Sequence, residues 1–330
     1  MPPQPLPKGL RPCCAFGYDL HAELLGLPVP FYQLNNVVTV DSLGHHQYND
    51  HLYSGVANLI GLSGENNGIV YTLRGGFIDT AHVRDTADMT VYIFSQLLPK
   101  LGQAFTLNLG EELAERRLVL LLLPLRSMHA SVTRWPPGCR RIWRSVAEWH
   151  EIAQWYGFES VRGFSEGVSA FSPEDLYSNL AGARLAASLI VGGQTKTQEM
   201  YNTAMETALR QALTQLAAQP AQITRFQFDM LDGRWWNSQR RVPEKYLVLH
   251  RNYQMGDDRL PTAIPGEIMP LLPLSLPHCW RGIQLSTLAQ LQLWPSEDMA
   301  QLPPPAHYYS EKILPPGGAG TATGRKTQNH

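Results

Sequence analysis

The sequence has few charged residues and almost no net charge. Charged side chains make up 17% of its 330 residues, and 27 basic against 28 acidic residues leave a formal net charge of −1. This balance gives no general electrostatic reason for binding to nucleic acid or to an anionic membrane surface. We therefore expect no nucleic-acid partner.

Long hydrophobic runs are also missing. The longest apolar stretch, Leu118 to Leu125, has the length of a strand and contains Pro124, whereas a helix that spans a membrane needs about 20 apolar residues. Residues 1–12 are rich in proline and lack the apolar core of a signal peptide. We expect no transmembrane segment, a flexible tail over residues 1–12, and any leader peptide to be absent from this sequence.

Cysteine is scarce, with only Cys13, Cys14, Cys139 and Cys279 in the chain. An even number permits two disulfides, but a chain of this length does not require them. Two interpretations stay open: disulfides that join the N-terminal segment to the rest of the protein, or four reduced thiols. The sequence indicates no oligomeric state.

Apolar residues make up 44% of the chain, which is typical of a globular domain, and 25 prolines and 27 glycines predict many loops. The helical patterns cluster in the middle of the chain, strand patterns lie on both sides, and the two do not alternate regularly. We therefore predict an α+β fold with one large domain over residues 13–295. Residues 296–330 should form a largely disordered tail rich in proline and glycine.

The hydrophobic patterns and helix-boundary signals predict the individual elements. Helices are expected over residues 46–60, 77–98, 141–156, 173–190 and 197–218, and strands over residues 35–40, 69–73, 118–125, 224–230 and 246–252. Ser172 is the expected N-cap of the fourth helix, with Pro173 at its first position.

The segment from Arg74 to Thr90 is the first candidate site. It indicates a Gly75-Gly76 turn that runs directly into a helix, on which Asp79 and His82 share a polar stripe within a nearly continuous apolar surface. Buried polar groups need partners, a metal or a substrate. Asp79 and His82 could bind one metal, Asp79 could orient His82 as a general base, or the two could form a hydrogen bond that only stabilises the core.

The second candidate is His150-Glu151. It begins like the zinc-protease pattern H-E-x-x-H, in which two histidines hold zinc and the glutamate activates water. Here Gln154 occupies the position of the second histidine, and glutamine is a poor zinc ligand. A metal site could still form if His82 supplied the missing imidazole.

Residues 163–167 match the G-x-S-x-G pattern of serine hydrolases. A nucleophile elbow needs an apolar strand before it and a helix directly after it, and this segment has neither. We therefore consider Glu166 of greater interest, as a carboxylate near His150. The alternative is that Glu166 is a solvated acid in a loop.

Two further groups could bind a ligand or serve only the fold. His45, His46 and His51 could contribute to a metal site or form an exposed polar helix start. Trp235 and Trp236 could form a sugar-binding surface, or could be core aromatic residues beside a turn.

Four segments of the chain resemble an uncharacterised family of bacterial exported proteins that is known as a domain of unknown function. They are residues 13–17 (Cys-Cys-Ala-Phe-Gly), residues 74–85 with the pattern R-G-G-F-I-D-x-x-H-x-R-D, residues 149–157 around Trp-His-Glu, and residues 169–179 around Ser-Pro-Glu-Asp. The resemblance implies a periplasmic or lipid-anchored protein and favours disulfides, and it implies no activity.

The main hypothesis is a metal-dependent hydrolase of the cell envelope. Its ligands would be His82, His150 and Asp79, and the metal would be zinc or another divalent transition metal. Glu151 would be the general base and Glu166 a second catalytic carboxylate, acting on a glycan or peptide of the envelope. The alternatives are a non-catalytic binding or scaffold protein that uses these residues as a polar network, and a metal-free glycan hydrolase or lyase.

Overall fold

The computed structural model describes residues 2–7, 11, 14–24, 26–48, 64–100, 103–120, 136–159, 165–276, 279–280, 283–284 and 289–295. Its helices are α2 (Thr80–Leu97), α3 (Pro136–Trp155), α4 (Asp175–Val191), α5 (Gln198–Gln215) and α6 (Ala221–Leu231). Short 3-10 turns are η1 (Val40–Ser42), η2 (Leu98–Lys100) and η5 (Lys245–Leu247).

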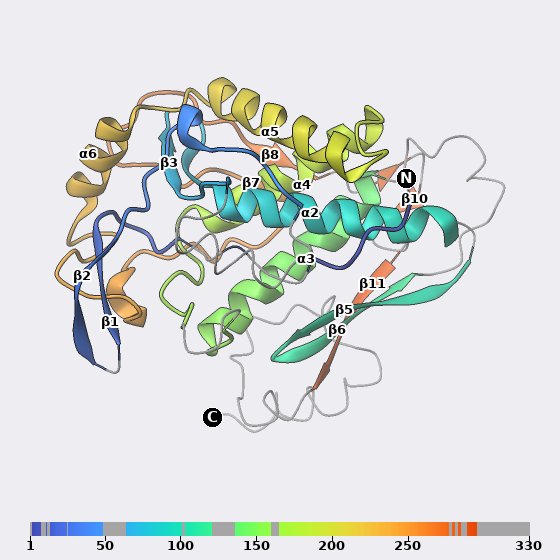
Figure 1. The fold of residues 1–330 in the computed structure, drawn as a ribbon, viewed down its shortest axis with the longest axis horizontal. Helices are drawn as coiled ribbons and strands as arrows, with labels where there is room; N and C mark the ends of the chain where they lie inside the picture. Colours follow the sequence, from blue (N-terminus) through green and yellow to red (C-terminus); the bar gives the residue numbers. More distant parts are fainter. Residues whose placement is uncertain are drawn as a thin grey trace.

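The strands lie before α2, between α2 and α3, and after α6, without regular alternation with the helices, which confirms the predicted α+β fold. They are β1 (Leu20–Leu24), β2 (Leu27–Leu34), β3 (Ile69–Thr72), β4 (Gly76–Asp79), β5 (Phe105–Glu112), β6 (Ala114–Leu120), β7 (Asp258–Arg259), β8 (Leu274–Ser275), β9 (Cys279–Trp280), β10 (Ile283–Gln284) and β11 (Ala289–Pro295). Figure 1 shows the β1–β2 hairpin and α6 at one end of the molecule, and the sheet of β5, β6 and β11 near the other.

All sheets among the described residues are antiparallel, with the order β11-β6-β5 in the largest and paired strands in the others. Buried and partly exposed side chains alternate along β6, so one face of this sheet packs on the core. Leu118 and Leu120 lie on the buried face. The strand predicted over residues 118–125 is confirmed as far as Leu120, and the rest lies outside the described residues.

Helix α2 lies at the centre of the molecule and is buried at every position except Asp85 and Gln96. It packs along α4, and α3 contacts both helices. The predicted burial of this helix is therefore confirmed. Its contact with α4 is very close, because a Cβ atom at Gly182 would lie only 2.1 Å from the carbonyl oxygen of Val83. This contact holds the first turn of α2 against the middle of α4.

The Gly75-Gly76 turn does not open a helix. Gly76 begins β4, and β3 and β4 form a hairpin in which Tyr71 pairs with Phe77 and Ile69 with Asp79. Gly76 adopts a φ of 65°, which favours glycine, and a Cβ atom there would lie 2.9 Å from the carbonyl oxygen of Thr262. The prediction that the helix starts directly after the glycines is therefore wrong, and α2 begins only after Asp79.

The strand predicted over residues 224–230 is also wrong. Apolar side chains at every second position suggested a strand, but Thr224, Phe228 and Leu231 form the buried face of α6 while Phe226 and Met230 are exposed. The alternation therefore reflects the two faces of an amphipathic helix.

Two other predicted strands are reduced to isolated bridges. Within residues 35–40, only Val37 forms a β-bridge, with Ile69. The segment predicted over residues 246–252 begins in η5 and forms one bridge, between Val248 and Trp236. Most of the helix predicted over residues 46–60 lies outside the described residues.

Helix starts also differ from the prediction at two places. The third predicted helix, expected from residue 141, already begins at Pro136 as α3. Glu174, not Ser172, is the N-cap of α4, and the backbone N–H of Ser172 donates to the carboxylate of Asp175 at 2.6 Å. At α5 the N-cap is Thr197, whose hydroxyl accepts from the N–H of Met200.

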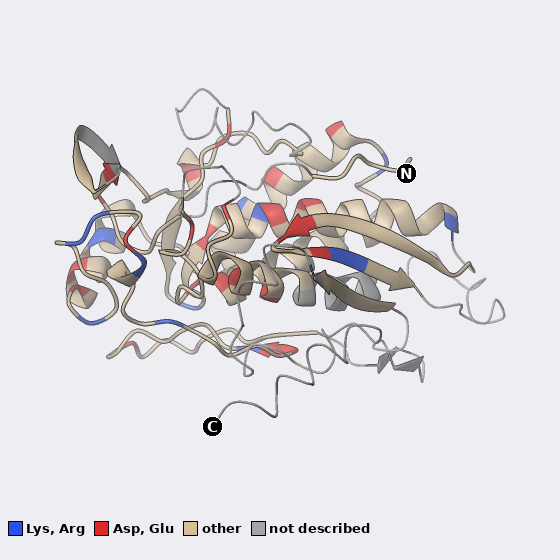
Figure 2. Ribbon diagram, turned by 90° about the horizontal axis from the view of Figure 1, so that it is seen from below, with Lys and Arg blue, Asp and Glu red and all other residues tan. Residues whose placement is uncertain are grey.

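The described part of the expected N-terminal tail is buried at Gln4 and Arg11 and otherwise at least partly exposed. The backbone N–H of Gln4 donates to the Ser95 hydroxyl at 2.8 Å, and Arg11 is only 1% exposed. Residues 296–330 lie outside the described residues. No described helix is both long and apolar enough to cross a bilayer. Figure 2 shows basic and acidic residues interspersed along the described chain.

Candidate metal centre

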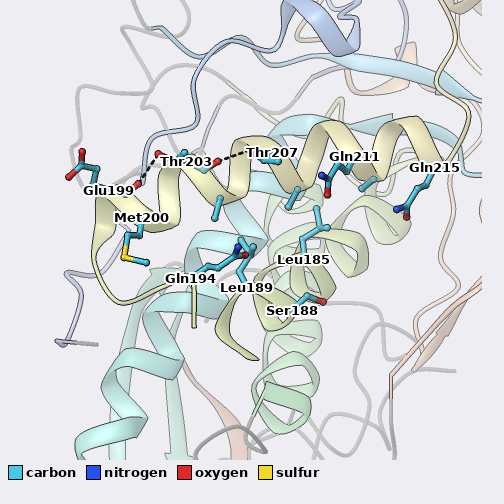
Figure 3. A pocket seen from close by; sticks show the side chains of 13 residues that line it. Leu185, Ser188, Leu189, Gln194, Glu199, Met200, Thr203, Thr207, Gln211 and Gln215 are labelled. Carbon is cyan, nitrogen blue, oxygen red and sulfur yellow. Dashed lines mark hydrogen bonds between the residues drawn. The ribbon is translucent and has the colours of Figure 1, made fainter. Parts of the chain in front are cut away.

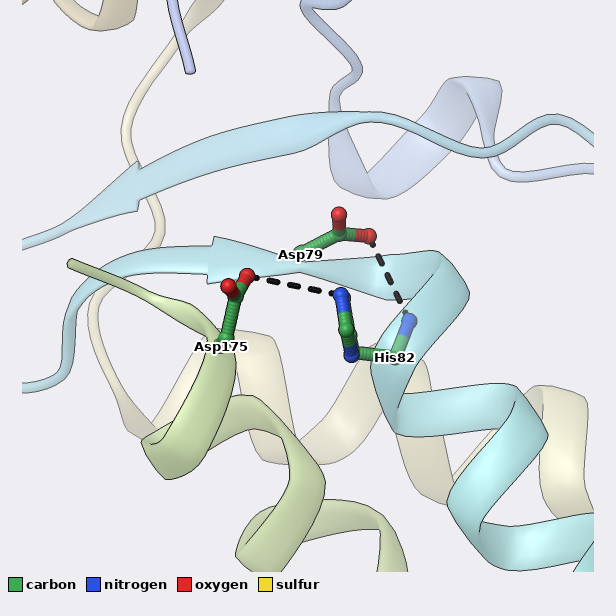
Figure 4. A group of neighbouring side chains, drawn as sticks. All are labelled: Asp79, His82 and Asp175. Carbon is green, nitrogen blue, oxygen red and sulfur yellow. Dashed lines mark hydrogen bonds and ion pairs between the residues drawn. The ribbon is translucent and has the colours of Figure 1, made fainter. Parts of the chain in front are cut away.

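Asp79, His82 and Asp175 meet where β4 ends and where α2 and α4 begin (Figure 4). One ligand atom from each residue lies within 4.8 Å of the others, and all three side chains are buried. The chain brings them together because α2 packs along α4 and begins near the start of that helix. Both helix N-termini carry partial positive charge, which favours carboxylates at this point.

Asp79 is the N-cap of α2. Its Oδ1 accepts from the N–H of Ala81 at 2.7 Å and from the N–H of His82 at 3.4 Å, and its Oδ2 accepts from the N–H of Cys14 at 3.3 Å. Its own N–H donates to the hydroxyl of Ser178 on α4. These bonds hold the carboxylate beside the imidazole of His82.

The orientation of His82 follows from its contact with Asn179. His82 Nδ1 lies 3.1 Å from Asn179 Oδ1, which also accepts from the Thr86 hydroxyl at 2.8 Å. The Asn179 amide group donates to Glu151 Oε1 at 3.4 Å, so a flipped amide would turn its oxygen toward that carboxylate. Nδ1 therefore donates to Asn179, and in the neutral imidazole Nε2 then presents its lone pair to the interior.

Two buried acceptor atoms consequently face each other. His82 Nε2 lies 3.4 Å from Asp175 Oδ1, and neither atom has a hydrogen-bond partner among the described residues. A lone pair opposite a carboxylate oxygen is unfavourable unless a proton or a cation lies between them.

Two more carboxyl groups, those of Glu151 and Glu174, lie beside these residues. Glu151 Oε2 accepts from the N–H of Phe171 at 2.8 Å, and its Oε1 is 3.8 Å from His82 Nδ1. Glu174 is 1% exposed, and neither of its carboxyl oxygens has a hydrogen-bond partner among the described residues.

The electrostatics of this carboxyl cluster (Asp79, Glu151, Glu174 and Asp175) disfavour ionisation without a cation. Burial raises the pKa of Asp79, and it raises the pKa of Glu174 and of Asp175 well above the usual range. Repulsion by neighbouring carboxylates, Asp79 on Glu174 and Glu151 on Asp175, raises the last two further. The Arg251 guanidinium acts in the opposite direction on Glu174 and lowers its pKa, but burial and the neighbouring carboxylates outweigh it.

A second buried acidic cluster behaves differently at two of its three carboxyl groups, while burial raises the pKa of the third, Asp85, to about 7. Arg11 pairs there with Glu65 at 2.5 Å, with Asp85 at 2.6 Å and with Asp88 at 3.0 Å. Burial alone would raise the pKa of Glu65 and of Asp88, but Arg11 overrides burial and lowers both. His46 also belongs to this cluster, since its Nε2 lies 3.0 Å from Asp88. We interpret the Arg11 cluster as structural, because it supplies its own cation.

Asp79, His82 and Asp175 fit a divalent transition metal. Imidazole and carboxylate are ordinary ligands of zinc, and an oxygen-rich set with one histidine also suits manganese or iron. The unpaired Nε2 and Oδ1 atoms provide two open ligand positions. An ion here would also balance part of the buried negative charge.

His150 lies next to this centre but faces another network. Its ring centroid is 6.4 Å from that of His82, its Nδ1 is 3.2 Å from Glu112 Oε2, and its Nε2 is 2.8 Å from the Gln154 amide nitrogen. The same amide group donates to Glu166 at 2.9 Å. The structure thus brings Asp79, His82 and Glu151 together and places His150 and Glu166 in an adjacent network.

The His150 network should make stability depend on pH. Burial alone would lower the pKa of His150, but the Glu112 carboxylate overrides it and raises the pKa to about 9. A raised histidine pKa stabilises the folded state fully below about pH 6.5, and this contribution is lost as the pH rises through about 9. We expect urea unfolding to show a loss of up to about 3 kcal/mol over this range.

Replacing Glu112 with glutamine should lower the His150 pKa, measured by NMR titration, and flatten this pH dependence. Glu115→Gln is the matched control, because Glu115 pairs only with groups on the outer face of the sheet, Arg117 and Asn108. A Glu112→Gln protein that retained the wild-type pH profile would contradict the assignment.

Asp175, Glu174 and Asn179 were missed as site residues by sequence reasoning. Glu174 and Asp175 matched the usual pattern of acids in the first turn of a helix. The only sequence feature that could have indicated a site was that two acidic residues, Glu174 and Asp175, are adjacent. Their burial depends on how α4 packs against α2, which the sequence does not show. No pattern in the sequence around Glu112 indicated that this residue would contact His150.

Several other sequence interpretations are settled by burial. Trp235 and Trp236 are 7% and 2% exposed and belong to a core cluster, so they form no sugar-binding surface.

Cys14 is a buried free thiol. Burial and the neighbouring carboxylates raise its pKa well above the usual range, which disfavours a nucleophilic thiolate. The side chains of Cys13, Cys139 and Cys279, part of the G-x-S-x-G segment, and His51 lie outside the described set.

A groove of about 740 Å³ lies between α4 and α5, away from the carboxyl cluster (Figure 3). Leu185, Leu189 and Met200 supply its apolar surface, and Thr203 and Gln211 are among its polar residues. No residue of the candidate metal centre lines it.

Comparison with known proteins identifies a family. The model of the family described as "Protein of unknown function (DUF4056)" matches residues 1–265. No curated protein and no solved structure matches the chain.

Proposed function

The chain belongs to this family of unknown function, DUF4056, and from the geometry of its buried centre we propose that it is a metal-dependent hydrolase. One observation carries the proposal: His82 Nε2 and Asp175 Oδ1 lie 3.4 Å apart, buried and without hydrogen-bond partners, beside Asp79. These three residues would hold zinc or another divalent transition metal.

A divalent metal supplies Lewis-acid chemistry: it makes water a nucleophile near neutral pH and stabilises the charge that develops on the substrate. Glu151 would accept the proton that water loses. Its carboxylate is held by the N–H of Phe171 and by the amide of Asn179, which also orients His82. Asn179 would therefore position both the ligand and the base.

The location and the substrate class complete the proposal. The resemblance of residues 74–85 and three other segments to exported bacterial proteins supports a place in the periplasm or cell envelope. A glycan or a peptide of the envelope would then be the substrate.

Turnover by metal-loaded protein tests the proposal. Protein stripped with a chelator and reloaded with zinc or manganese should hydrolyse purified peptidoglycan or the ester p-nitrophenyl acetate, whereas stripped protein should not. Glu151→Gln should retain the metal and lose about 10²–10⁴-fold in kcat, as expected for loss of a general base. Glu199→Gln, an exposed glutamate on α5, is the control. Equal rates for loaded and stripped protein, or for Glu151→Gln and wild type, would contradict a hydrolase.

A non-catalytic envelope protein is the second candidate, and the burial of the site favours it. Asp79, Glu151 and Asp175 are 0% exposed, and His82 is 5% exposed. If the residues serve only as a structural metal site, metal removal should lower Tm while no substrate is turned over. If they form a metal-free polar network, added metal should leave Tm unchanged.

A further inference from the structure

We propose that Arg251 is a positioning residue of the metal centre, because its guanidinium holds the peptide group that orients the proposed general base, Glu151. Arg251 comes from the segment that follows η5, outside the helices and the strand that form the centre. Its role rests on the proposed function and adds a residue to it.

The loop before α4 points two successive backbone N–H groups at the centre. The N–H of Phe171 donates to Glu151 Oε2 at 2.8 Å, and the N–H of Ser172 donates to Asp175 Oδ2 at 2.6 Å. One N–H group therefore orients the proposed base, and the next orients a proposed metal ligand. Successive N–H groups around a turn of this kind form concave sites that hold anionic groups.

Phe171 needs support from outside the loop to keep this arrangement. Its φ of 57° lies in the left-handed region, which is unfavourable for a bulky aromatic residue. Its ring is 0% exposed and packs against Tyr253 with a centroid distance of 5.0 Å, so glycine could not replace it without leaving a cavity. The left-handed backbone therefore persists because neighbouring groups hold it.

Arg251 and Asn252 supply this support on both sides of Phe171. The Arg251 guanidinium donates to the carbonyl oxygen of Ala170, and to that of Val168 at 3.3 Å. The N–H of Asn252 donates to the carbonyl oxygen of Phe171 at 2.8 Å. One short segment thus holds the peptide groups before and after the Cα atom of Phe171.

A single peptide group connects Arg251 to Glu151. The carbonyl oxygen of Ala170 accepts from Arg251, and the N–H of the same peptide group, which belongs to Phe171, donates to Glu151. A cation at the carbonyl side polarises the peptide group and strengthens the hydrogen bond that its N–H donates. Arg251 therefore both fixes the direction of this N–H and strengthens its hold on the carboxylate.

The guanidinium is fixed on its other sides. It donates to the carbonyl oxygen of Lys245, and its Cζ atom lies 4.9 Å from the centroid of the Trp155 ring. A planar, forked guanidinium can donate to several carbonyl oxygens and stack on a ring at the same time, which the single ammonium group of lysine does not reproduce.

The test is the zinc affinity and the turnover of Arg251→Met and of the milder Arg251→Lys, which keeps the positive charge and loses the fork. Folding is checked by circular dichroism, Kd for Zn²⁺ is measured by titration calorimetry, and kcat is measured with p-nitrophenyl acetate at saturating Zn²⁺. We expect Zn²⁺ to bind about 10–100-fold more weakly and kcat to fall by a similar factor, as for other residues that orient metal ligands. KM should stay near the wild-type value.

Arg210→Met is the matched control. Arg210 on α5 also donates to backbone carbonyl oxygens of a loop, those of Val40 and Gly44, but this loop contributes no residue to the centre. Arg210→Met should therefore match wild type in Kd and kcat, whatever its Tm.

The outcomes separate this role from the proposed function. A folded Arg251→Met with wild-type Kd and kcat and only a lower Tm would make Arg251 a structural residue and overturn its role. If wild type binds Zn²⁺ but hydrolyses nothing, the hydrolase is overturned, and a wild-type Kd in Arg251→Met would then overturn the positioning role as well. No Zn²⁺ bound to folded wild type would overturn the metal centre and this role together.

Discussion

Replacing His82 with alanine should abolish tight metal binding. The substitution removes the only imidazole that faces Asp79 and Asp175 among the described residues. We expect the affinity for Zn²⁺ to fall by about 100-fold or more, since even substitutions behind the ligands cost about 10–100-fold. Wild-type protein should be stabilised by metal, by about 2.7 kcal/mol at a metal concentration of 100 Kd. His82→Ala should show almost none of this stabilisation by calorimetry.

A matched control exists in the same chain. The His45 side chain is 83% exposed and pairs with Glu206 on α5, so His45→Ala should bind metal like wild type. In metal-free protein, His82→Ala removes a lone pair that faces a carboxylate oxygen, and this offsets part of the cost of the cavity and of the lost hydrogen bond to Asn179. A large loss of stability in metal-free His82→Ala, together with a wild-type protein whose stability does not change when metal is added, would instead support a structural polar network.

Replacing Arg11 with methionine should strongly destabilise the protein. Arg11 is 1% exposed and pairs with Glu65, Asp85 and Asp88, and it also donates to the carbonyl oxygen of Gln47 at 2.8 Å. The substitution leaves buried carboxylates without their cation. Loss of one partner of a buried ion pair costs about 3–5 kcal/mol, and we expect a loss of this size in the free energy of unfolding by urea.

An exposed arginine provides the comparison for Arg11→Met. Arg240 pairs with Glu244 at 3.0 Å, and its side chain is 54% exposed. Surface pairs contribute about 0–1 kcal/mol, so Arg240→Met should change stability little. If Arg11→Met cost no more than Arg240→Met, the Arg11 cluster would not anchor the N-terminal segment to α2.

The part of the site that local pattern could predict is the Asp79–His82 pair. Its polar residues stand out because the rest of α2 is apolar on every side, and such a helix must be buried. The spacing of three residues suggested a shared helix face. The structure instead makes Asp79 the N-cap and His82 a first-turn residue, so the two side chains meet across the start of the helix.

The third ligand could not be predicted in the same way. Asp175 lies far from His82 in sequence, and the packing of α2 along α4, with hydrogen bonds from Asp79 to Ser178 and from His82 to Asn179, brings them together. His150 was the candidate that the sequence favoured, because it belongs to an incomplete zinc-protease pattern. Glu112 on β5 and Gln154 on its own helix instead engage its ring nitrogens.

The fold, like the site, could be predicted only where the information lies in a local sequence pattern. The helices at 141–156, 173–190 and 197–218 were predictable because each has a long helical pattern, and their boundaries moved by a few residues at most ends. Residues 224–230 were misassigned because seven residues with alternating apolar side chains fit a strand and a two-faced helix equally well. The order of the strands, and hence the sheet of β5, β6 and β11, depends on contacts that no local pattern contains.

Anomalous X-ray diffraction at the zinc absorption edge, from crystals of the zinc-loaded full chain, tests the central claim most directly. We expect an anomalous peak bounded by His82 Nε2 and carboxylate oxygens of Asp79 and Asp175, at about 2.0–2.2 Å from each ligand atom. A crystal grown with zinc that shows no peak there, and in which Nε2 instead donates a hydrogen bond to Asp175, would contradict the metal centre.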